Sequence, residues 1–177
     1  MANSVKETSI INRVASSGLI TLDLEELYPT FEIVEVDLKN LLVEGVMLRE
    51  QDLREFVRTH SWSSYQNKGV TVFCSADAIL PTWAFMLVAI ALQPYANRVR
   101  FGTKETFIAN HFQEALNTIN WEQYRDAKVV IKGCGDVYVP EFVFVEAATR
   151  LRAVAASIMY GEPCSTVPLF KRQKPGV

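Results

Sequence analysis

An internal repeat at an offset of 59 residues constrains this chain more than any other feature of its sequence. Residues 59–92 align without a gap with residues 118–151 and share nine identities in 34 positions. Each copy contains a T-x-x-W-x-x-Y segment, a short apolar run, a polar loop and a P-x-aromatic-x-F segment. A fixed period of this kind indicates a duplicated strand–loop–helix unit. The alternative is that two strand–helix units simply share one hydrophobic period. The identical residues of the first copy are Thr59, Trp62, Tyr65, Val70, Asp77, Pro81, Phe85, Ala89 and Leu92.

Hydrophobic periodicity predicts strands that alternate with helices along the chain. Helices are expected over 51–59, 82–93, 105–119 and 141–156, and strands over 19–24, 31–38, 70–73, 98–101 and 128–131. This order predicts an α/β fold, with a partly parallel sheet flanked by helices, the duplicated unit, and a β-rich N-terminal third. A length of 177 residues predicts a single domain, 1–177. The tail from Gly161 is expected to be extended, because Pro163 and Pro168 exclude helix.

Charge and hydropathy exclude several classes of function. The sequence contains eighteen Lys and Arg residues and twenty Asp and Glu residues. It therefore lacks the basic excess of a nucleic-acid binder that contacts phosphates. The most apolar run, residues 83–92, has about half the length that a membrane span needs.

The N-terminus lacks the apolar core of a signal peptide, which predicts a cytoplasmic protein. The sequence contains no nucleotide-binding motif. The apolar helix at 82–93 is compatible with a homodimer.

Two polar loops stand at matching places in the repeat. The first runs from Cys74 to Asp77, and the second contains Cys134 and Asp136. Each loop follows a predicted strand and precedes a predicted helix, and this edge of an open α/β sheet is where ligands bind. If the two repeat units pack as neighbours, both loops open into one crevice.

The two aspartates have two possible roles. Asp before a helix is usually an N-cap. Pro81 and Pro140 favour the first helical position, which would put the caps at Leu80 and Val139. Asp77 and Asp136 are therefore expected to be loop residues, which either form turns or belong to a site.

The three cysteines are candidate metal ligands. A single cysteine is most often a small buried hydrophobe, and this alternative is strongest for Cys74, which ends a strand. Cys134 lies between two glycines, which permit close backbone approach, and Cys164 lies in an extended segment. Thiolates from Cys74, Cys134 and Cys164, with carboxylates from Asp77 or Asp136, are a donor set that suits zinc or iron. There is no C-x-x-C pair to add specificity.

Four stretches of the sequence resemble a bacterial protein family known as domain of unknown function 2480. The resemblance covers nearly the whole chain but implies no established activity. Genes of that family often lie near those for sulfur mobilisation and iron–sulfur assembly, so the resemblance implies a protein partner in sulfur or iron–sulfur metabolism. The stretches that carry it are residues 12–24, 74–83, 131–136 and 157–168.

Two functions from different classes follow from these residues. The first is a metal- or cluster-binding accessory protein; in a sulfur-carrier variant of it, Cys164 would hold a persulfide. The second is a metal-free scaffold or interaction domain, in which the cysteines are core residues and Trp62 and Trp121 are packing centres. A cysteine-based enzyme without metal ranks last, because no histidine partner for a nucleophile is evident.

Overall fold

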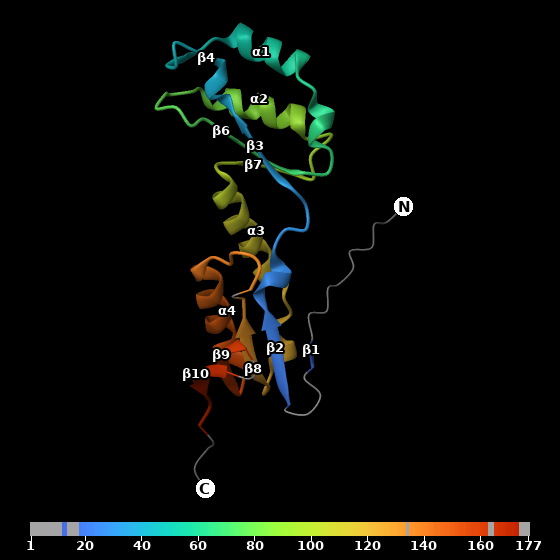
Figure 1. Ribbon diagram of the computed structural model, residues 1–177, viewed down its shortest axis with the longest axis vertical. Helices are drawn as coiled ribbons and strands as arrows, with labels where there is room; N and C mark the ends of the chain where they lie inside the picture. The colour runs from blue at the N-terminus through green and yellow to red at the C-terminus, as the bar shows by residue number, and fades with distance from the viewer. Residues whose placement is uncertain (1–11, 14–17, 134, 163–164, 174–177) are drawn as a thin grey trace. The chain divides into compact units, whose positions relative to one another are not determined.

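The computed structural model describes residues 12–13, 18–133, 135–162 and 165–173, and all structural statements below concern these residues. The chain divides into two compact units (Figure 1). Unit 2 consists of residues 29–110, and unit 1 consists of the chain before residue 29 and from residue 111 onward. The chain of unit 2 is therefore inserted within the chain of unit 1.

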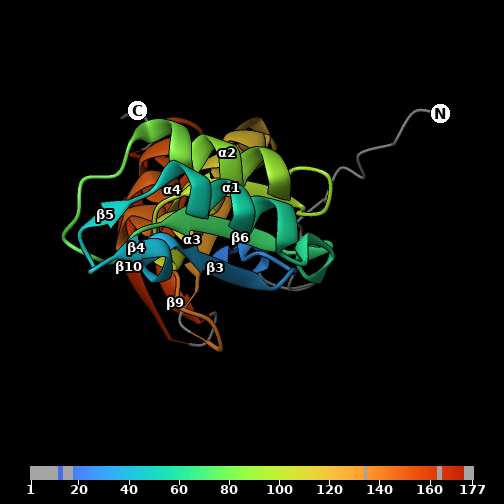
Figure 2. The same cartoon turned by 90° about the horizontal axis from the view of Figure 1, so that it is seen from above.

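Unit 2 is built on a parallel sheet in the order β3-β6-β7. Helix α2 connects β6 to β7, and α1 and α2 lie on one face of the sheet (Figure 2). The elements are β3 (Ile33–Asp37), η2 (Leu38–Leu41), β4 (Leu42–Val43), β5 (Met47–Leu48), α1 (Glu50–Thr59), η3 (Trp62–Tyr65), β6 (Gly69–Phe73), α2 (Thr82–Leu92) and β7 (Arg98–Phe101).

Aromatic rings pack closely against β6 of unit 2 at Gly69. A Cβ at Gly69 would lie 2.6 Å from the ring of Phe107 and 2.7 Å from the ring of Phe31. The two rings meet edge to face, with centroids 6.1 Å apart, and Phe107 is fully buried. Gly69 is thus required by close packing, since any side chain there would displace Phe107.

Unit 1 is built on a sheet in the order β1-β2-β8-β9-β10. Strands β2, β8 and β9 are parallel, while β1 and β10 pair antiparallel at the two edges. Helix α4 connects β8 to β9 and buries residues at helical spacing, from Val143 through Ala147 to Leu151. The elements are β1 (Asn12–Arg13), β2 (Leu19–Asp23), η1 (Leu24–Leu27), α3 (Lys104–Thr118, which begins in unit 2), η4 (Trp121–Tyr124), β8 (Lys128–Lys132), α4 (Glu141–Val154), β9 (Ser157–Glu162) and β10 (Ser165–Lys171).

The duplication extends to the strand register of both sheets. Elements η4, β8, α4 and β9 each begin 59 residues after η3, β6, α2 and β7. Gly69 of β6 pairs with Arg98, and Lys128 of β8 pairs with Ser157, so the same register recurs at the same offset. Strands β3 and β2 occupy the same position in their respective sheets, next to β6 and β8.

Individual hydrogen bonds repeat at this offset as well. The indole Nε1 of Trp62 donates to the carbonyl of Val57 at 2.8 Å, and that of Trp121 donates to the carbonyl of Leu116 at 3.2 Å. Asn67 and Asp126, which both have positive φ, donate their backbone N–H to residues 95 and 154. The Trp and Tyr of the shared motif therefore close the same helix-to-strand turn in both units.

The α/β fold class, the parallel strands and the strand-rich N-terminal region are confirmed. The expected capping positions are wrong by one residue. Pro81 and Pro140 are themselves the N-caps, with extended backbone, and their carbonyls accept the N–H groups of Ala84 and Val143. The single domain remains a prediction. The tail from Gly161 contributes the last residues of β9 and the whole of β10. Pro168 is tolerated because β10 is an edge strand and its register is irregular there.

Within the described part of the chain, no helix combines the length and the apolar composition needed to span a membrane.

Candidate functional site

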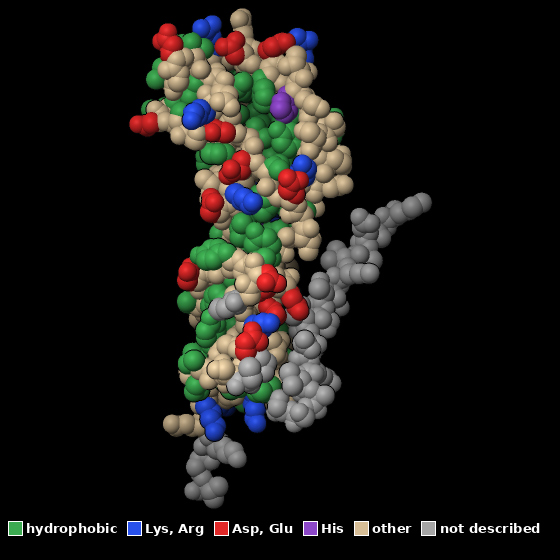
Figure 3. Space-filling view, in the orientation of Figure 1, with side chains coloured by type: hydrophobic (Ala, Val, Ile, Leu, Met, Phe, Trp, Pro, Cys, Tyr) green, Lys and Arg blue, Asp and Glu red, His purple; other side chains and the backbone are tan. Residues whose placement is uncertain are grey.

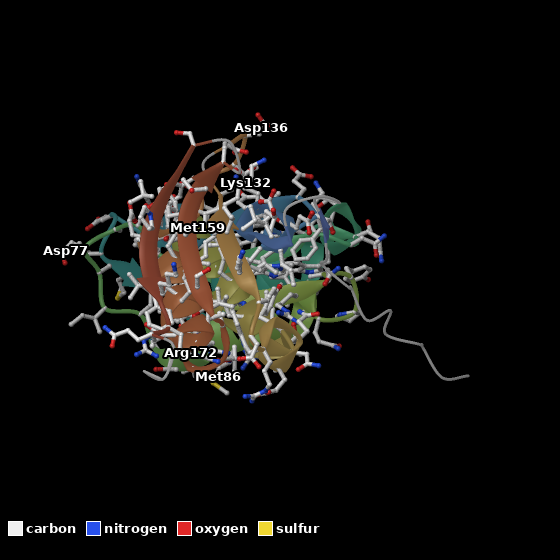
Figure 4. The ribbon with its side chains drawn as sticks, turned by 90° about the horizontal axis from the view of Figure 1, so that it is seen from below. Asp77, Met86, Lys132, Asp136, Met159 and Arg172 are labelled. Carbon is white, nitrogen blue, oxygen red and sulfur yellow. The ribbon has the colours of Figure 1, made fainter. Side chains whose placement is uncertain are left out.

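The loop after β8, at the carboxyl edge of the unit 1 sheet, is held by Glu25 from the start of η1. One Glu25 oxygen accepts the backbone N–H of Gly135, and the other accepts the N–H of Asp136 at 3.2 Å. Asp23 in turn caps η1 by accepting the N–H of Glu25 at 3.0 Å. In Figure 4, Asp136 lies beyond Lys132, the last residue of β8, at this edge. The end of β2 therefore fixes the backbone of the loop that carries Asp136.

Side chains of the protein lie close to both described glycines of this loop. A Cβ at Gly133 would lie 3.0 Å from the Phe144 ring, and a Cβ at Gly135 would lie 2.7 Å from a carboxylate oxygen of Glu25. The sequence prediction that these glycines permit the close approach of a ligand stays a prediction, since the neighbours are the side chains of Phe144 and Glu25. A larger residue at position 135 would push the Glu25 carboxylate away from the N–H groups that it binds.

A pocket opens beside this loop, with a volume of about 610 Å³. This is within the size range of small-molecule sites. The rings of Phe144 and Tyr160 form part of its wall and meet edge to face, with centroids 5.8 Å apart. It is lined by Gly133, Gly135, Asp136, Val137, Tyr138, Val139, Glu141, Phe144 and Tyr160.

Charges around the pocket are mainly acidic. The hydroxyl of Tyr138 donates to Glu141 at 2.8 Å. The carboxylate of Glu141 also accepts a hydrogen bond from the backbone N–H of Glu141. This bond and the one from Tyr138 hold the pKa of the Glu141 carboxyl below its usual value. The same contact raises the pKa of Tyr138. Glu141 is therefore ionised at neutral pH, at the N-terminus of α4, where the helix dipole also favours a negative charge.

A basic residue at this edge is already paired. Acidic side chains surround a basic one on the face of unit 1 seen in Figure 3. The Nζ of Lys132 lies 3.5 Å from a Glu162 oxygen and 3.8 Å from an Asp23 oxygen. Attraction to Glu162 first, and to Asp23 next, raises the pKa of Lys132. This ion pair joins the ends of the neighbouring strands β8 and β9.

The equivalent loop of unit 2 is held by Asp37 at the end of β3. Its carboxylate accepts the hydroxyl of Ser75 at 2.6 Å and the backbone N–H groups of Ser75 and Lys39 at 3.0 and 2.9 Å. Partial burial opposes ionisation of Asp37, but these bonds outweigh it and lower its pKa. In both units a carboxylate at the end of a strand (Asp37 of β3) or just after it (Glu25 after β2) therefore fixes the loop that follows the neighbouring parallel strand.

The predicted site residues are distributed over both units. Cys74 and Asp77 belong to unit 2; Cys74 is half-buried, with its Sγ 3.9 Å from the carbonyl of Ala76, and Asp77 is exposed. Asp136 is exposed in unit 1, and Cys134 and Cys164 lie outside the described residues. Among the described residues, no three His, Cys, Asp or Glu side chains form a group able to hold a metal.

Sequence reasoning missed Glu25 and Asp37, which organise the two loops. One signal was available, because Asp37 ends an alternating strand and Glu25 lies two residues after the end of another. Their partners are far away in sequence, however, and nothing in the local pattern identifies them.

Comparison with known proteins gives a family but no activity. Residues 8–172 match the family model described as protein of unknown function DUF2480. No curated protein and no solved structure matches the chain. The match spans nearly the full sequence, and the chain therefore belongs to the DUF2480 family.

Proposed function

We propose that the chain is a cytoplasmic accessory protein that binds a metal ion or cluster through cysteine thiolates and serves iron–sulfur assembly or sulfur transfer. Zinc or iron suits the donor set, since both accept thiolate together with carboxylate ligands. Cys134 and Cys164 supply thiolates and Asp136 supplies a carboxylate, all from unit 1; Cys74 and Asp77 of unit 2 are tested separately as further donors. A partner protein from sulfur or iron–sulfur metabolism would deliver or receive the cargo.

The ion pair between Lys132 and Glu162 is the observation that carries this proposal. Cys134 follows Lys132 by two residues, and Cys164 follows Glu162 by two residues. The two charged groups are 3.5 Å apart at the ends of adjacent parallel strands. Lys132 and Glu162, each two residues before one of these cysteines, therefore lie at the same edge of one sheet. Asp136, two residues after Cys134 in the sequence, lies at the same edge, in a loop that Glu25 fixes.

Thiol reactivity tests the proposal. The thiols of the native, metal-loaded protein are titrated with an aromatic disulfide reagent, with and without a chelator. We expect Cys134 and Cys164 to react at least tenfold faster once the chelator removes the metal, because a metal-bound thiolate is shielded. In Cys134→Ser, the thiol of Cys164 should react fast without chelator.

Cys74→Ser is the matched variant in unit 2. If Cys74 is the third ligand, this substitution also frees the other two thiols; if it is a core residue, their rates stay as in the wild type. The proposal would be overturned if the chelator did not change the thiol rates of the wild type and if Cys164 reacted in Cys134→Ser as it does in the untreated wild type.

A metal-free interaction domain is the second candidate, and the surface of α2 favours it. This helix has no charged residue and exposes Trp83, Met86 and Ile90 along one side. Cys74 packs against the apolar core of unit 2, as a structural cysteine would. In this function the protein could act as a homodimer. Chelator-independent thiol rates, together with a concentration-dependent mass in solution, are the results that this candidate predicts.

A further inference from the structure

The pocket of unit 1 has a chemical character of its own, independent of the cysteines. Its described lining combines three aromatic rings, from Tyr138, Phe144 and Tyr160, with the carboxylates of Asp136 and Glu141. None of the nine described lining residues is basic. Rings and carboxylates together attract cations, because an aromatic face carries partial negative charge.

The groups that would attract an anion here are already satisfied by the protein. The N-terminus of α4 faces Glu141, whose carboxylate bonds the backbone N–H of its own residue. The N–H groups of Gly135 and Asp136 bind Glu25. A helix N-terminus carries roughly half a positive charge, which a single carboxylate exceeds. The local field around the pocket is therefore negative.

We propose that this pocket binds a small organic ammonium ion with an apolar body. The rings of Phe144 and Tyr160 would pack against the apolar groups, and Glu141 and Asp136 would face the positive charge. A volume of about 610 Å³ accommodates a ligand larger than a simple ion. This site goes beyond the proposed metal function: it uses none of the thiols, and it shares only Asp136 with the proposed metal ligands.

Two probes of nearly equal size and shape distinguish the effect of the ligand's charge from the effect of its shape. Choline and 3,3-dimethylbutan-1-ol have nearly the same size, but only choline is charged. Each is titrated into the full chain, and binding is followed through the backbone amide signals of Gly133, Val139 and Tyr160 by NMR. We expect choline to bind at least tenfold more tightly than the alcohol, and acetate to produce no saturable shift at these signals.

Three variants assign the interaction to the pocket. Glu141→Gln removes a charge at an exposed position and should weaken choline binding several-fold. Tyr160→Leu removes one ring and should weaken it similarly. Phe101→Leu is the matched control, because Phe101 occupies the equivalent position in unit 2 and pairs with Phe85; it should bind choline like the wild type.

Several results would overturn this assignment. They are equal binding of choline and the alcohol, tighter binding of acetate, choline shifts outside the pocket residues, or no shift with any probe. If Tyr160→Leu does not fold, Glu141→Gln still decides the role of charge. Thiol reactivity is measured separately, so a negative choline experiment does not count against the metal proposal.

Discussion

The carboxylate of Glu25 accepts the backbone N–H of Asp136 at 3.2 Å, across 111 residues of sequence. This contact fixes the loop that leads from β8 into α4 and forms one side of the pocket. The same carboxylate also accepts the N–H of Gly135. Candidate ligands in this loop are therefore positioned by a residue from the other end of the chain.

Replacing Gly135 by Ala should release this loop. The new Cβ would lie 2.7 Å from a Glu25 oxygen, so the flexible carboxylate must move away. We expect global stability to fall by about 1 kcal/mol or less, since one or two hydrogen bonds are lost at an exposed site. Hydrogen exchange at the Asp136 amide should accelerate clearly.

Glu25→Gln is the companion variant, because its amide keeps one acceptor oxygen and should give an intermediate exchange rate. An Asp136 amide that exchanges in Gly135→Ala as slowly as in the wild type would show that Glu25 does not hold the loop.

The two motif tryptophans should differ in their contribution to stability. Trp62→Phe removes the indole donor to Val57 and should lower the free energy of unfolding by about 1–2 kcal/mol. Trp121→Phe should cost less, because Arg150 also donates to the carbonyl of Leu116, at 2.9 Å. Urea unfolding of both variants measures the difference. A larger loss for Trp121→Phe would contradict this account of the repeat.

Stability should fall at high pH through Tyr124. Burial, with a smaller contribution from Glu26, raises the pKa of Tyr124 to about 12, although Gln123 acts in the opposite direction. The folded protein thus holds the phenolic proton more tightly than the unfolded chain. This stabilisation is complete below pH 10 and is lost towards pH 12, by about 2 kcal/mol.

Tyr124→Phe should flatten this part of the stability profile and remove the tyrosine that titrates last in the ultraviolet spectrum. Equal slopes for the wild type and the variant between pH 10 and 12 would contradict the assignment.

A pair of equivalent leucines tests whether the units fold as one domain. Leu92 in unit 2 and Leu151 in unit 1 are both fully buried and stand 59 residues apart. Each Leu→Ala change should cost about 2–5 kcal/mol. In a single domain, either change lowers the protection of the slowest-exchanging amides in both units by the same amount. Loss of protection confined to the substituted unit would show two domains.

Periodicity in the sequence was sufficient to predict the helices and parallel strands. The apolar run from 83 to 92 and the repeated motif around Trp121 indicate a helix and a turn through neighbouring residues alone. The observed bounds of α2, α4 and their neighbouring strands lie within a few residues of the expected ones. The predicted cap at Leu80 was wrong by one residue, because the backbone of Pro81 is extended and Pro81 is itself the N-cap.

The candidate site was less predictable, because it depends on contacts between distant residues. Nothing near Glu25 in the sequence indicates that its carboxylate binds Gly135 and Asp136. The insertion of unit 2 between η1 and the second half of α3 was also not predictable from local pattern, since β2 pairs with β8 only in the folded sheet. Asp77 and Asp136 were correctly expected to be loop residues, as each stands four residues before its helix cap.

Metal content is the most direct test of the central proposal. Untagged protein is purified without oxygen, and its elemental composition and absorption spectrum are measured for the wild type, Cys134→Ser and Cys164→Ser. We predict about one zinc per chain, or iron with visible charge-transfer bands, in the wild type, and well below one metal per chain in both variants. Wild-type protein that holds no metal even after reconstitution, or variants that keep the full metal content, would contradict the proposal.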